Sequence, residues 1–210
     1  MRGPLGIVGS TRVRAVLMLL LVNGAVVALG QAPDRGRHDL HQDSKVWIEG
    51  GSNLGDWSCT ATTVEARIEA DPSAGRDESS LAGLIRRVSV KTAVHDLKCG
   101  NKRMEKDLYR ALKADDPSVP SHIVGVFSAS SGSKDSAAVE TEGSITVAGV
   151  EKSVHVRIAL ERLADGTIKA RGAVPLLMTN FGVTPPTGLF GLVRSHNEIV
   201  VKFELVISPP

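Results

Sequence analysis

The chain has 210 residues, of which 42% are hydrophobic but only 3% aromatic, and its formal net charge is +2. That length suits one sizeable domain, with an aliphatic core that has few large rings to fill its middle. Residues 1–30 contain three arginines and no acid, so the rest of the chain carries 22 basic and 23 acidic side chains, a net charge of −1. The sequence lacks the basic stripe that phosphate backbones require, which argues against nucleic acid as a partner.

Residues 1–30 have the pattern of a signal peptide, because two arginines precede an apolar run that ends in small residues. Ala28-Leu29-Gly30 and then Gly30-Gln31-Ala32 predict cleavage after Gly30 or Ala32. The alternative is a retained membrane anchor. However, Asn23-Gly24 interrupts the run, and the apolar pieces are shorter than the roughly 20 residues that a bilayer requires. We expect an exported protein, periplasmic or secreted, with no stable membrane anchor after cleavage.

Residues 31–45 are polar and show no period, which predicts a disordered lead-in before a folded domain at 46–208. His38 and His41 lie in this segment beside acidic residues. A weak metal clip is one interpretation. Solvated linker histidines are the favoured one, because no ordered scaffold is expected to hold a metal there.

The folded part shows period-two alternation of apolar and polar residues, which indicates strands with one buried face. The alternating segments are 46–48, 62–69, 88–95, 123–127, 139–147, 154–161, 168–176 and 199–207. The most regular of them form a hairpin between Gly143 and Glu161, with Gly149 in its turn. Nearly all the connections are short, so the pattern predicts an all-β fold, an antiparallel up-and-down barrel of about eight strands.

One helix interrupts the strands. Asn101 is a suitable N-cap, and Met104, Leu108, Ala111 and Leu112 follow at steps of three and four residues. Such a helix can close one mouth of a barrel or simply cover core, and the sequence leaves both interpretations open.

Small residues recur at inward positions of the predicted strands: Ala66, Gly125, Gly143, Ala170 and Gly172. They are too small to fill the centre of an eight-stranded barrel, which favours a cavity. Tight packing at strand crossings, or β-bulges at the glycines, is the equally weighted alternative.

Cys59 and Cys99 are the only cysteines. Export to an oxidising compartment permits a disulfide between them, and two unpaired buried thiols are the alternative. They form no CxxC redox pair, and two ligands alone do not make a zinc site. We expect neither a metal nor a bound cofactor.

Several short motifs, in this order and spacing, resemble those of the YceI-like family. The resemblance covers about 46–207 and is carried by Trp57-Ser58-Cys59, 94–100 with Met104, 143–150, 178–183 and Pro185-Pro186-Thr187. It implies a lipocalin-like barrel, exported, that encloses an elongated apolar pocket. It also implies a non-covalent ligand, a polyisoprenoid or another long-chain amphiphile such as a quinone-like lipid.

An aliphatic tunnel needs no catalytic group, because each buried CH₂ contributes about 0.8 kcal/mol. The expected ligand-binding walls are Ile145, Val147, Val156, Ile158, Val174, Leu176, Phe181 and Phe203, with Met104 and Leu108 at a mouth. A homodimer is compatible with this interpretation.

Two other classes of protein remain as alternatives. One is a packed β-barrel that serves only as a scaffold for surface interactions with other proteins. The other is an enzyme that uses His122, His155 or His196. The sequence has no nucleophile elbow, HExxH motif or phosphate-binding glycine loop, so we expect no catalysis.

Overall fold

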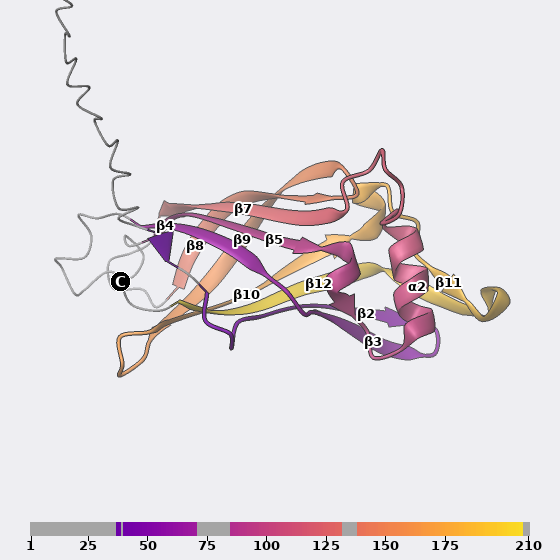
Figure 1. Ribbon diagram of the computed structural model, residues 1–210, viewed down its shortest axis with the longest axis horizontal. Coiled ribbons are helices and arrows are strands. Elements are labelled where there is room, and N and C mark those ends of the chain that lie inside the picture. Colours follow the sequence, from indigo (N-terminus) through magenta and orange to yellow (C-terminus); the bar gives the residue numbers. More distant parts are fainter. Residues whose placement is uncertain (1–36, 39, 71–84, 132–137, 208–210) are drawn as a thin grey trace, which may run out of the picture. The chain divides into compact units, whose positions relative to one another are not determined.

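The computed structural model describes residues 37–38, 40–70, 85–131 and 138–207. Within these ranges the chain is all-β, with one antiparallel sheet of twelve strands and one α-helix, α2 (Lys102–Ala111). The sheet curls on itself, and α2 lies at one of its ends (Figure 1). The predicted signal peptide and the cleavage site lie outside the described residues.

The long strands are β2 (Lys45–Ser52), β3 (Gly55–Ala61), β4 (Glu65–Ala70), β5 (Ile85–Ala93), β7 (His122–Ser131), β8 (Ala138–Val147), β9 (Val150–Arg162), β10 (Ile168–Leu177) and β12 (Val193–Ile207). Three strands have two residues each: β1 (Arg37–His38), β6 (Leu97–Lys98) and β11 (Thr187–Gly188). Short 3₁₀ turns follow three of the strands: η2 (Val94–Asp96), η3 (Met178–Phe181) and η4 (Leu189–Gly191).

Hydrogen bonding orders the sheet as β1-β4-β5-β7-β8-β9-β10-β12-β2-β3-β6, with β11 paired to β12. Over the described ranges, no strand pair joins β1 or β4 to β3 or β6. The all-β antiparallel prediction is therefore confirmed, whereas the ring of eight strands is replaced by a curled sheet with more strands. The strands absent from the prediction are the two-residue strands β1, β6 and β11 and one long strand, β3. The inward residues of β3, Trp57, Cys59 and Ala61, form no aliphatic run.

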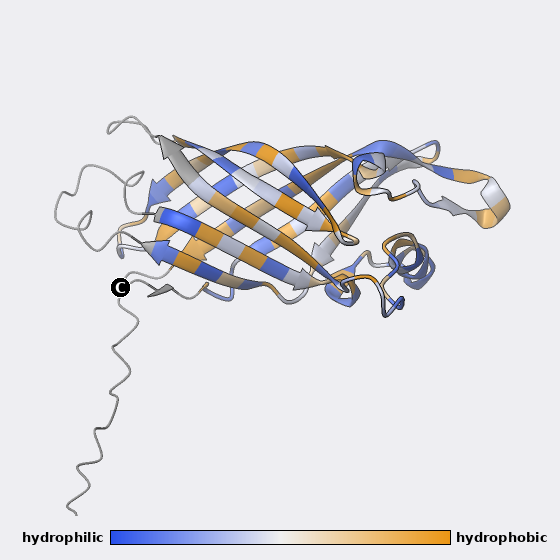
Figure 2. Ribbon diagram, turned by 90° about the horizontal axis from the view of Figure 1, so that it is seen from above, coloured by the Kyte–Doolittle hydropathy of each residue, from blue (hydrophilic) through white to orange (hydrophobic). Residues whose placement is uncertain are grey.

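The predicted alternation sets the register of the sheet. β10 and β12 pair from Ile168↔Ile207 to Leu176↔Ile199, so apolar residues face one another across the pair on one side of the sheet. Apolar and polar residues alternate along the strands in the same way in Figure 2. The β8–β9 hairpin closes at Ala148 and Gly149, which have positive φ angles of 48° and 80°, as a two-residue turn with matching twist requires.

The described part of the predicted lead-in is folded. Arg37–His38 pairs with β4, Leu40 forms an isolated bridge to Ile207, and the His41 N–H donates to the carbonyl of Val206. The disorder expected for residues 40–45 is therefore wrong. These residues obtain order from backbone hydrogen bonds to β12, which do not depend on side-chain period.

Candidate functional site: an apolar cavity inside the sheet

The concave face of the sheet encloses a cavity of about 170 Å³. All nine long strands contribute to its wall. The contribution is smallest from β3 and β4, with one residue each, Trp57 and Ile68, and larger from the other strands, whose lining residues lie at alternate positions. On β12 alone, every second residue from Ile199 to Ile207 lines it. Eight residue steps along a strand span roughly 27 Å, so the wall suits an extended ligand.

Thr92 and Thr141 carry the only hydroxyl groups in the described wall. Both side chains already donate hydrogen bonds to backbone carbonyls, Thr92 to Thr63 at 2.8 Å and Thr141 to Val156 at 2.9 Å. The indole N–H of Trp57 likewise donates to the carbonyl of Gly51 at 3.1 Å. The wall can therefore bury hydrocarbon, and its polar side chains are already satisfied.

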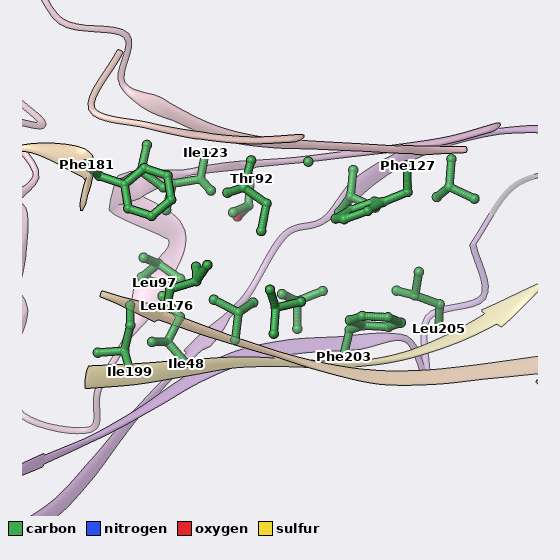
Figure 3. A pocket seen from close by; sticks show the side chains of 18 of the residues that line it. Ile48, Thr92, Leu97, Ile123, Phe127, Leu176, Phe181, Ile199, Phe203 and Leu205 are labelled. Carbon is green, nitrogen blue, oxygen red and sulfur yellow. The ribbon is translucent and has the colours of Figure 1, made fainter. Parts of the chain in front are cut away.

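Glycines keep the middle of the cavity open by letting aromatic rings lie along the wall. Gly143 faces Phe127 directly across the β7–β8 pair, and Gly172 faces Phe203 across the β10–β12 pair. A Cβ atom at either glycine would overlap the opposing ring. Phe127 and Phe203 lie on opposite walls in Figure 3, each ring turned along its strand.

The same arrangement occurs a third time, because Gly50 faces Trp57 across the β2–β3 pair and a Cβ there would overlap the indole. The small residues at inward strand positions therefore have a third explanation, besides an empty barrel and a β-bulge. The small residues accommodate rings, and the rings lie flat enough to leave the cavity.

Eight of the ten residues expected to contact a ligand line the cavity: Leu108, Ile145, Val147, Ile158, Val174, Leu176, Phe181 and Phe203. The other two do not. Val156 is only 1% exposed and belongs to the packed core. Met104 lies one turn before Leu108 on α2, and it is Leu108, Ala111 and Leu112 that face the cavity.

Sequence reasoning missed wall residues that lie outside regular strands. Leu97 follows the η2 turn, Met178 begins η3, Val183 lies two residues after η3, and Pro186 precedes β11. No periodic signal marks these positions. All four positions lie in the motifs that carry the family resemblance.

The helix end of the cavity is fixed by covalent and polar contacts. A disulfide joins Cys59 on β3 to Cys99 before α2, as predicted. Asn101 caps the helix by accepting from the N–H groups of Arg103 and Met104, also as predicted. Leu108 on the capped helix lines the cavity.

Two further α2 side chains hold the helix against the neighbouring turn. The Tyr109 hydroxyl donates to the carbonyls of Leu97 and His95 at 2.8 and 3.0 Å. The carboxylate of Glu105 accepts from the Cys99 N–H at 3.2 Å and from Lys102 at 3.3 Å. Burial opposes ionisation of Glu105, but these hydrogen bonds prevail and lower its pKa.

The histidines considered for catalysis lie on different strand pairs. His122 is opposite Ala93 on β5, His155 is opposite Glu142 on β8, and His196 lies beside Gly51 of β2. The structure does not bring them together. No group of three or more His, Cys, Asp or Glu side chains able to hold a metal occurs in the described ranges. His41, considered for a weak metal clip, contacts Asp43 at 3.3 Å.

A curled antiparallel sheet around an apolar cavity, with a helix at one end, defines the lipocalin-like class of fold. No protein-family model matches the chain, and no curated protein matches its sequence. Solved structures give the particular fold. Burkholderia cenocepacia BcnA matches with a TM-score of 0.61 and 19% identity, over 81% of this chain and 100% of that one.

Two further structures share the fold. A polyisoprenoid-binding domain from Saccharophagus degradans, implicated in plant cell wall breakdown, has a TM-score of 0.58 and 9% identity, over 83% of this chain and 98% of its own. The Campylobacter jejuni YceI protein has a TM-score of 0.52 and 16% identity, over 70% and 82%. The chain therefore has a YceI-like fold. In the described ranges, no helix is long and apolar enough to cross a membrane.

Proposed function

We propose that this is an exported, non-catalytic binding protein that holds a long-chain amphiphile, a polyisoprenoid or a quinone-like lipid, in its apolar cavity. The observation that carries the proposal is the continuous hydrocarbon wall, whose threonine hydroxyls are already satisfied by the backbone. Burying ten methylene groups contributes about 8 kcal/mol before the entropy of binding is subtracted. Such a site binds an alkyl chain without any charged or catalytic group.

Two other observations support this proposal. The Cys59–Cys99 disulfide fits an oxidising compartment, as export predicts. A structural neighbour with the same fold is a polyisoprenoid-binding domain. The alternative of a packed scaffold requires an interior filled by side chains, and the cavity argues against it. The proposed contacts are the eight predicted residues that line the cavity, with Met104 and Val156 removed.

Ala170 and Ala173 on β10 provide a matched test. Ala170 lines the cavity, whereas Ala173 faces solvent three residues later on the same strand. Ala170→Phe places a ring in the lumen and should weaken binding of a long-chain isoprenoid alcohol at least tenfold. Ala173→Phe adds the same ring outside and should bind like the unchanged protein.

Binding is measured by fluorescence titration, and lipids extracted from protein purified from its native compartment are identified by mass spectrometry. Circular dichroism shows whether each variant is folded, and Ala170→Val serves as a smaller change if Ala170→Phe is not. Equal binding by folded Ala170 and Ala173 variants, or no hydrophobic molecule in the extract and no isoprenoid binding, would contradict the proposal.

A further inference from the structure

Exposed apolar side chains gather at one place on the surface. Of the five large hydrophobic residues exposed in the described ranges, four lie in two adjacent turns, and the fifth, Leu177, lies on β10. These four form what we call the apolar tip: Leu54 (71% exposed), Leu189 (42%), Phe190 (101%) and Leu192 (74%).

The two turns are fastened to each other. Leu54 lies in the β2–β3 turn, and the other three lie where η4 joins β11 to β12. Asn53 donates through its side chain to the carbonyl of Leu192 at 2.9 Å and accepts from the Arg194 N–H at 2.7 Å. The apolar side chains therefore sit on a braced support.

The backbone turns Phe190 fully into solvent. Leu189 and Phe190 both have positive φ angles, 48° and 58°, in succession. This left-handed conformation is uncommon for residues that carry a side chain. Strained backbone of this kind concentrates at functional sites, and here it carries the fully exposed ring of Phe190.

The size of the tip selects the kind of partner. A stable protein–protein interface takes about 800 Å² from each partner, or roughly 20 residues a side. The four side chains of the apolar tip, three of them on the hairpin formed by β11, η4 and β12, fall well short of it. A lipid bilayer makes no such demand, because each apolar side chain that enters the interface contributes by itself. In both views the hairpin reaches beyond α2 (Figures 1 and 2).

The charges around the tip suit an anionic surface. Gly188 of β11 lies against Asp107 of α2, which places this helix beside the tip. On α2, Lys102 pairs with Glu105 and Arg110 pairs with Asp107. Five other charged side chains, on α2 and on the strand ends that carry the tip, form no ion pair with a described residue: Arg103, Lys106, Arg194, Asp56 and Glu198. Three of these five are positive and two negative, which leaves an excess of positive charge.

We propose that the apolar tip docks the protein on the surface of an anionic lipid bilayer, with Phe190 and the three leucines in the interface and the α2 cations over the headgroups. The hairpin begins immediately after Pro186, which lines the cavity. Docking therefore brings the helix end of the cavity to the membrane. The proposal concerns residues that do not line the cavity, so it can fail while the lipid-binding function stands.

Vesicle flotation tests the docking. The full protein is mixed with phosphatidylcholine vesicles with or without phosphatidylglycerol, and the fraction that floats is measured against salt. We expect binding to the anionic vesicles that weakens as salt rises. Phe190→Ser with Leu192→Ser should lower the partition coefficient at least a hundredfold, about tenfold for each side chain. Leu177→Ser, an exposed leucine outside the tip, is the matched control and should float like the unchanged protein.

Charge variants and cavity binding complete the test. Arg103→Ala with Lys106→Ala should weaken binding to anionic vesicles about fivefold per residue and leave neutral vesicles unaffected. All tip variants should bind a long-chain isoprenoid alcohol normally. Unchanged flotation of the Phe190→Ser, Leu192→Ser variant overturns the proposal. The proposal is also overturned if analytical ultracentrifugation shows the unchanged protein as a dimer and this variant as a monomer, with no difference in flotation between them.

Discussion

The middle of the curled sheet and its helix end are both lined by apolar side chains, but the middle is kept open and the helix end is held in place by specific bonds. In the middle, Phe127 and Phe203 lie along the wall over glycines, so the space between opposite strands stays open. At the helix end, a disulfide ties β3 to Cys99 just before α2, Asn101 caps the helix, and the buried Glu105 accepts from the Cys99 N–H. The comparison shows that the openness of the middle depends on the absence of Cβ atoms, whereas the end depends on specific bonds.

Because of this difference, we expect substitutions in the two regions to have separate effects on stability and on the cavity. Breaking a bond at the helix end should destabilise the chain and loosen α2 without filling the cavity. Adding one methyl group in the middle should fill the cavity while the helix end keeps its contacts.

Reducing the disulfide should have the largest effect on stability. Cys59 and Cys99 are 40 residues apart, and a crosslink that closes a loop of that length stabilises a fold by roughly 3–4 kcal/mol in the chain-entropy model. Urea unfolding with and without reductant measures this loss. Hydrogen exchange should show α2 losing protection before β10.

The control for this prediction is Cys59→Ala with Cys99→Ala, which should match the reduced protein and ignore reductant. An unfolding midpoint that reductant leaves unchanged, in protein shown to be fully reduced, would mean that the other contacts suffice to hold the helix end.

Alternation predicted much of the middle and little of the end. Side chains at every second position of β10 and β12 were assigned to the inner face, and their register places them there. The capped helix was also predicted, because Asn101 and the spacing of Leu108, Ala111 and Leu112 are local signals. Local period and local capping are readable because neighbouring residues alone determine them.

Other features depend on residues distant in sequence and could not be predicted. The order of β1 comes from its pairing with β4, and Leu40 is ordered by a bridge to Ile207. The seating of Phe203 over Gly172 requires the β10–β12 register. Val156 illustrates the limit within a strand: alternation placed it inward, and only packing decides that it is core and not cavity wall.

Gly172→Ala should have the next largest effect, and it acts on the middle. The new Cβ would overlap the ring of Phe203, so the ring must swing into the lumen or the strands must part, at a cost of about 1–3 kcal/mol. Binding of a long-chain isoprenoid alcohol should weaken, while α2 keeps its protection from hydrogen exchange.

Gly188→Ala is the matched control for this substitution. Its nearest neighbour would be Val193 at 3.7 Å, an ordinary contact, so both stability and isoprenoid binding should be nearly unchanged. If Gly172→Ala bound as tightly as the unchanged protein, the rings would not be what keeps the cavity open.

The smallest effect is a pH dependence located at the helix end. Burial opposes the charge on Glu105, yet the hydrogen bonds from Lys102 and the Cys99 N–H lower its pKa below the ordinary value of 4.5. The folded state therefore binds this proton less readily than the unfolded state does. The stability it contributes is present above the ordinary pKa and is lost as pH falls through the lowered one.

Glu105→Gln keeps a hydrogen-bond acceptor near Cys99 but cannot ionise, so it removes this contribution. The free energy of unfolding, measured with urea between neutral pH and pH 3, should decline less steeply with falling pH in the variant than in the unchanged protein. Asp116→Asn is the control, because hydrogen bonds from Ser118 lower the pKa of this exposed carboxyl outside α2. If both variants changed the slope of the free energy of unfolding against pH equally, the acid dependence would not be specific to the helix end, because Asp116 lies outside α2.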